Sequence, residues 1–169
     1  FPGPGTDQLL FGHHEGVLRS DNGGRRWSPL AFGEDAMGMA PAPDGSIVVA
    51  GHLVFQASRD GGATWAPIEA DLPSLDIHAF ARSLGDPARM WAYLAEGGVY
   101  ESSDSGATWT KVTDGDVINL TAIREADTDV LLGIDPFRGL VRSPDGGRTW
   151  VLTGKPPTSP VTSLAATPD

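Results

Sequence analysis

An eight-residue pattern, S-x-D-x-G-x-T-W, occurs four times in this chain of 169 residues and constrains its fold more than any other feature. Residues 58–65, 102–109 and 143–150 are full copies, and residues 20–27 are a divergent copy with Asn22 and Arg26 in place of Asp and Thr. The tryptophans that end the four copies are 38, 44 and 41 residues apart. A motif that recurs at this interval is typical of repeat proteins, in which each supersecondary unit stacks on the next.

Each copy of this repeat motif is predicted to form the turn of a β-hairpin. An apolar segment precedes every copy and a short strand-like segment follows every tryptophan. Glycine supplies the positive φ of tight turns, and an aspartate carboxylate accepts hydrogen bonds from turn amides and from Ser or Thr hydroxyls. We therefore expect a structural role, with each tryptophan facing the core. The residues concerned are Ser20, Asn22, Gly24, Trp27, Ser58, Asp60, Gly62, Thr64, Trp65, Ser102, Asp104, Gly106, Thr108, Trp109, Ser143, Asp145, Gly147, Thr149 and Trp150.

The repeat motif resembles the Asp box, or bacterial neuraminidase repeat, of sialidases, sortilin-type receptors and photosystem II assembly factors. The resemblance implies a β-propeller in which each motif lies between the third and fourth strands of an antiparallel blade. Asp boxes occur in enzymes and in non-enzymes alike. The resemblance therefore implies a fold and leaves the activity open.

Strand-like segments separated by turn signals divide the chain into four blades, and no segment has a helical period. The blades cover roughly residues 6–30, 36–70, 76–112 and 117–153. The first blade shows three strands, and segment 161–169 carries a strand-like run that resembles the missing one. We expect one all-β propeller domain over residues 1–169, closed by this terminal strand or by strand exchange in a homodimer. A longer propeller, of which this chain is a part, is the open alternative.

The charge and composition narrow the classes of partner. The net charge is −10, which argues against nucleic acid and anionic membranes and favours cations or a basic protein surface. The chain has no cysteine, which excludes disulfides and thiolate metal sites. No apolar run approaches the roughly 20 residues of a membrane span. Because the chain opens inside a repeat, we expect a processed extracytoplasmic protein or a truncated form.

All four histidines are predicted to lie at one rim of the blades. In an up-and-down blade, the start of strand one and the end of strand two share a rim, opposite the turn that joins strands three and four. Imidazole and thioether groups suit copper, or zinc if nearby carboxylates such as Asp35 and Asp76 join them. Ordinary loop histidines and a packed methionine are the alternative interpretation. The predicted metal ligands are His13, His14, Met37, His52 and His78.

The favoured interpretation is a non-catalytic binding or scaffold propeller that takes a protein, a small ligand or a metal at this rim. A glycoside hydrolase is the alternative. The resemblance implies that a sialidase needs three arginines and a tyrosine nucleophile, but the arginines gather near the repeat motifs, at the opposite rim, which argues against that activity. A hydrolase with two carboxylates stays open. Its candidate acids are Asp35, Asp76, Glu96, Asp116 and Asp135.

Overall fold

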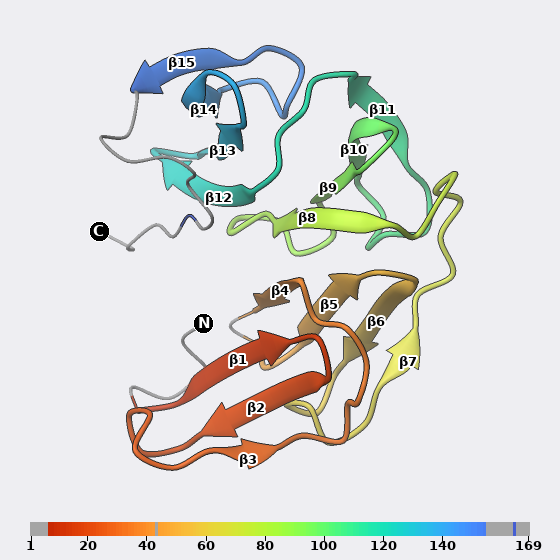
Figure 1. Ribbon diagram of the computed structural model, residues 1–169, viewed down its shortest axis with the longest axis vertical. Coiled ribbons are helices and arrows are strands. Elements are labelled where there is room, and N and C mark those ends of the chain that lie inside the picture. The colour runs from red at the N-terminus through yellow and green to blue at the C-terminus, as the bar shows by residue number, and fades with distance from the viewer. Residues whose placement is uncertain (1–6, 43, 155–163, 165–169) are drawn as a thin grey trace. The chain divides into compact units, whose positions relative to one another are not determined.

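The computed structural model describes residues 7–42, 44–154 and 164, and these residues form an all-β structure of fifteen strands (Figure 1). The strands make four antiparallel sheets, numbered here as blades one to four. Blade one contains β1 (Leu9–His13), β2 (Gly16–Ser20) and β3 (Ser28–Pro29). Blade two contains β4 (Gly38–Pro41), β5 (Ile47–Gly51), β6 (Val54–Ser58) and β7 (Ala66–Pro67). Blade three contains β8 (Ile77–Arg82), β9 (Met90–Leu94), β10 (Gly98–Ser102) and β11 (Thr110–Thr113). Blade four contains β12 (Leu120–Glu125), β13 (Thr128–Asp135), β14 (Gly139–Ser143) and β15 (Val151–Gly154).

Within every sheet the strands lie in the order in which they follow along the chain, which is the up-and-down order of a propeller blade. The predicted all-β class with β-propeller blades is confirmed, including three strands in blade one and four in each of the others. The predicted closing strand within segment 161–169 falls outside the described residues, apart from Leu164. Closure by that strand, or by a second copy of the chain, therefore stays a prediction. The described residues include no helix that is long and apolar enough to cross a membrane.

The chain divides into two compact units, and each has a core of its own. The first unit holds blades one and two and includes Leu75–Ile77; the second holds blades three and four and includes Glu69–Ser74. In the first unit, Leu10 and Val17 of blade one are buried with Ile47 and Val49 of blade two. In the second unit, the buried cluster joins Trp91, Tyr93 and Val99 of blade three to Leu131 and Val141 of blade four. Trp91 has no exposed surface and is part of this core.

In each blade, the strand before the repeat motif (β2, β6, β10 or β14) ends at a buried serine. These serines are Ser20, Ser58, Ser102 and Ser143, and none is more than 1% exposed. In residues 102–109, the Ser102 hydroxyl donates to Asp104 Oδ1 (2.9 Å) and accepts from the Gly106 amide (3.0 Å). The Asp104 carboxylate also accepts from the Thr108 amide (2.9 Å) and the Thr108 hydroxyl (2.6 Å). The side chains of Ser102 and Asp104 thus bind backbone amides of the turn and hold it closed.

The same bonds recur in residues 58–65 and 143–150, and the backbone explains the invariant spacing within the motif. The glycine at the fifth position has φ between 84° and 91° in all four copies, a region that side chains with a Cβ rarely adopt. The residue before it is also left-handed. It is glycine in three copies and Ser105, with φ 65°, in the other.

The divergent copy shows that the turn can also form around an uncharged oxygen acceptor. The Asn22 side-chain oxygen accepts from the Ser20 hydroxyl (3.1 Å) and from the Arg26 amide (2.8 Å), as an aspartate does in the other copies. The prediction that all motif tryptophans face the core is wrong for Trp27, which is 39% exposed. Its ring contacts the exposed Phe11 ring edge-on, with the ring centroids 6.1 Å apart. Trp65, in contrast, packs against the core of its unit.

We predict that Ser102→Ala destabilises the protein by about 1–3 kcal/mol, because the buried Gly106 amide then has no acceptor. Urea denaturation followed by tryptophan fluorescence measures the change. The matched control is Ser103→Ala in the same turn, since Ser103 is exposed and its substitution should leave the unfolding free energy nearly unchanged. Equal destabilisation by both variants would contradict a specific role for the buried hydroxyl.

The motif carboxylates should make the fold sensitive to acid. The Thr108 hydroxyl, with the Thr108 amide and the Ser102 hydroxyl, lowers the pKa of Asp104 from 3.8 to about 2, and Thr64 and Ser58 do the same for Asp60. Because the pKa of Asp104 is lower in the folded state than in the unfolded state, its ionisation stabilises the fold. This stabilisation is fully present above pH 3.8 and is lost as the pH falls through about 2. We therefore expect Asp104→Asn to be less stable than wild type near neutral pH, with the gap closing by pH 2. Denaturation curves across this range test it, and a gap independent of pH would contradict it.

Candidate functional site

The candidate site lies where blades one and two meet within the first unit. Antiparallel pairing places Gly38, which begins β4, opposite Ala50 near the end of β5, so the segment before β4 lies beside the residues after β5. The amide of Ala36, in that segment, donates to the carbonyl of His13 at the end of β1 (3.0 Å). Asp35 is therefore held between the end of β1 in blade one and the end of β5 in blade two.

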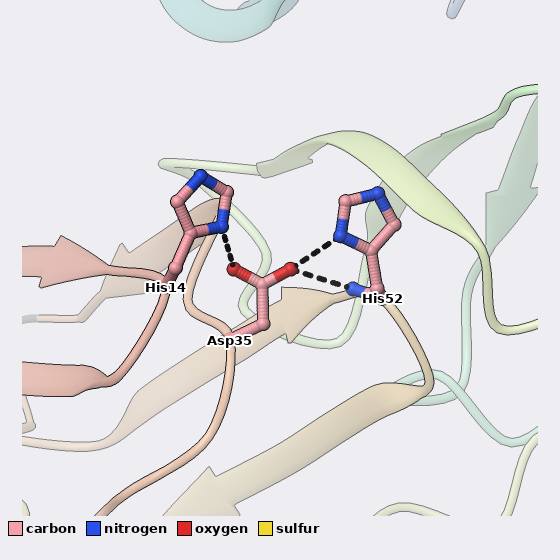
Figure 2. A group of neighbouring side chains, drawn as sticks. All are labelled: His14, Asp35 and His52. Atoms are coloured by element: carbon pink, nitrogen blue, oxygen red, sulfur yellow. Dashed lines mark hydrogen bonds and ion pairs between the residues drawn. The ribbon is translucent and has the colours of Figure 1, made fainter.

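Asp35 contacts two histidines, one from each blade (Figure 2). Its Oδ1 lies 2.9 Å from Nδ1 of His14, and its Oδ2 lies 2.6 Å from Nδ1 of His52. The backbone amide of His52 also donates to Oδ2 (3.1 Å). Each carboxylate oxygen thus faces one imidazole nitrogen, and both rings turn the same kind of atom toward Asp35.

The carboxylate is sheltered while the imidazoles are open to solvent. The Asp35 side chain is 13% exposed, whereas those of His14 and His52 are 79% and 46% exposed. Burial raises the pKa of Asp35, but the hydrogen bonds from the His52 amide and ring and from His14 outweigh it, so the pKa lies below its ordinary value. At neutral pH Asp35 is consequently a fixed negative charge beneath two accessible nitrogen ligands.

An aspartate recurs at this position in the later blades. Asp35, Asp76 and Asp116 are 41 and 40 residues apart, and each precedes a buried apolar residue. Asp76 Oδ1 lies 3.6 Å from Nε2 of His52, and Asp116 accepts a hydrogen bond from the Tyr93 hydroxyl (3.0 Å). Burial and the Asp116 carboxylate raise the pKa of Tyr93 to about 12. Each aspartate thus contacts a side chain at or after the end of a strand in the preceding blade. The regular spacing of the three aspartates in the sequence could have revealed this shared position.

The structure brings together two of the five predicted metal ligands, His14 and His52, around Asp35. His13 instead stacks on Phe11, with ring centroids 6.0 Å apart, and its Nδ1 accepts from the Glu15 amide (3.2 Å). Met37 is 43% exposed. His78 is the second residue of β8 and lies in the second unit.

Several solved structures of known proteins resemble this chain in fold. No family model matches the chain, and no curated protein matches its sequence. Among solved structures, an ancestral GH74 enzyme has a TM-score of 0.62 at 18% identity, over 100% of this chain and 24% of the other. YCF48 bound to D1 peptide has 0.57 at 15% identity (86% and 50%), and the Hadza microbial sialidase Hz136 has 0.51 at 22% identity (92% and 39%). The chain thus spans a quarter to a half of these β-propeller proteins, and at such identities the likeness concerns the fold alone.

Gly51 is predicted to be required for this geometry. A Cβ at Gly51 would overlap the backbone carbonyl oxygen of Asp35 and crowd its carboxylate, so Gly51→Ala must displace the segment that carries Asp35. We expect a loss of about 1–3 kcal/mol from this overpacking. Gly33→Ala is the matched control, because a Cβ there meets no atom within 4 Å. Thermal unfolding of both variants tests the prediction, and a Gly51→Ala protein as stable as Gly33→Ala would contradict it.

Proposed function

We propose that this chain is an extracytoplasmic, non-catalytic binding module of the Asp-box propeller class. The four repeat motifs support the class, since they share one turn geometry built from the residues that define the pattern. The rim formed by the start of strand one and the end of strand two is its ligand-binding surface. There the first unit exposes two histidines on a fixed carboxylate.

The observation that carries this proposal is that the candidate catalytic acids make structural contacts. Both oxygens of Asp35 accept hydrogen bonds, Asp116 accepts from Tyr93, and Asp135 accepts from the amides of Phe137 and Arg138. A glycosidase acid needs a raised pKa to stay protonated, whereas the pKa of Asp35 is lowered. These carboxylates position the backbone, which suits a scaffold better than a hydrolase.

The partner that we propose is a cationic segment of another protein. The net charge of −10 favours association with basic surfaces and raises the rate of encounter with them. The likeness to YCF48, whose structure was solved with a bound peptide, supports peptide binding by this class of fold. Near the rim, Glu15 and Glu34 are exposed and supply negative charge.

Fluorescence anisotropy with two labelled peptides, equal in length and apolar content but opposite in charge, tests the proposal. We expect the basic peptide to bind in a salt-dependent manner and the acidic one not to bind. Glu15→Gln/Glu34→Gln should weaken binding several-fold, whereas Asp44→Asn, in the β4–β5 turn at the opposite edge, should not. Equal affinity for both peptides, or binding of neither at high micromolar concentration, would overturn the proposal.

A glycoside hydrolase is the second candidate, favoured by the fold likeness to a GH74 enzyme and a sialidase. Incubation of the protein with aryl glycosides and plant polysaccharides distinguishes the two. Turnover that is abolished by Asp35→Asn or Asp116→Asn would establish catalysis, and its absence would favour the binding module.

A further inference from the structure

We propose that His14, Asp35 and His52 form a binding site for one divalent transition-metal ion, zinc or copper. This inference goes beyond the proposed function, because it requires no peptide or protein partner. The three side chains come from different segments of the first unit: the turn after β1, the segment before β4 and the residue after β5. Their potential ligand atoms all lie within 4.8 Å of one another.

The distances suit a shared ion. Zinc lies about 2.0–2.2 Å from imidazole nitrogen and carboxylate oxygen, so the ligand atoms of a tetrahedral ion are about 3.3–3.6 Å apart. The two nitrogen–oxygen pairs are at hydrogen-bond distance, 2.9 Å and 2.6 Å, and need to separate by less than about 1 Å to admit the ion. Figure 2 shows Nδ1 of both rings turned toward the Asp35 carboxylate. A cation can therefore replace the protons between these atoms with small rotations of exposed side chains.

The donor set selects the class of metal. Two neutral imidazoles with one carboxylate suit zinc, copper and similar borderline ions, whereas calcium and magnesium prefer oxygen ligands throughout. Three protein ligands leave coordination positions for water or for a group from a partner. The exposure of His14 and His52 makes those positions accessible from solvent.

Two features hold the ligands in place. The His52 amide donates to Asp35, and Gly51 lets the Asp35 backbone pass close beside it, so the carboxylate and the His52 backbone are fixed together. On the other edge of the His52 ring, the Asp76 carboxylate lies 3.6 Å from Nε2. When a metal ion displaces the proton that Nδ1 shares with Asp35, the proton that remains on Nε2 faces the Asp76 carboxylate, which favours this tautomer. Asp76 is thus an orienting residue for the site.

The test is titration of the chelator-treated full chain, with its affinity tag removed, by zinc and by copper in isothermal calorimetry. We expect one equivalent of metal to bind at micromolar concentration or tighter. His14→Ala and His52→Ala should each weaken binding by at least about 10–100-fold, the range found for weaker perturbations of metal sites. His13→Ala and Met37→Ala are matched controls that should bind as the wild type does. Copper electron paramagnetic resonance should show two coupled nitrogens, and one in either single variant.

Three results would overturn the proposal: no stoichiometric binding to a folded wild type, binding that survives in His14→Ala/His52→Ala, or binding lost equally in His13→Ala. Asp35→Asn is the informative third variant, because it keeps the size of the side chain while removing the charge; unchanged affinity would exclude Asp35 as a ligand. Circular dichroism of every variant confirms folding. Peptide affinity measured with chelator present separates this proposal from the proposed function, since each can fail while the other holds.

Discussion

The blades depend on a serine hydroxyl that is buried at the end of the strand before each repeat motif. This hydroxyl can only be buried because the turn beyond it supplies both an acceptor and a donor: the side-chain oxygen two residues on and the glycine amide four residues on. The turn itself requires two consecutive residues with left-handed φ angles. This requirement explains why glycine occupies the fifth position and why the spacing of the motif is constant. The closed turn thereby positions the next strand of each blade.

A second set of contacts works at the opposite ends of the strands. The aspartate that precedes each first strand lies against the end of a second strand, and its partner differs from blade to blade: histidine for Asp35 and Asp76, tyrosine for Asp116. The aspartate is thus the same at all three positions, whereas the residue that it contacts differs. A partner that is also a metal ligand or a proton carrier converts a structural contact into a site with chemical potential. His14 and His52 are such partners of Asp35.

The carboxylates near the candidate site make contacts within the blades. The candidate catalytic carboxylates Asp135, Asp116 and Asp35 accept hydrogen bonds from amides, a hydroxyl and imidazoles, and for Asp35 these bonds lower the pKa. The same fixed charge orients imidazoles and attracts cations. An acidic surface then adds steering toward basic partners, independently of any one contact.

The sequence by itself determined the repeat, the all-β class, the number of strands in each described blade and the turn chemistry of the motif, because these depend on short-range patterns and on the φ that glycine alone adopts readily. It also predicted that the histidines lie at one rim, because strand order dictates which strand ends share an edge. Only the tertiary structure decided which rim residues meet. His13 and His14 are neighbours in the chain, yet the turn after β1 sends one ring toward Phe11 and the other toward Asp35. The exposure of Trp27 and the central place of Asp35 were likewise decided by packing between blades, which no local pattern encodes.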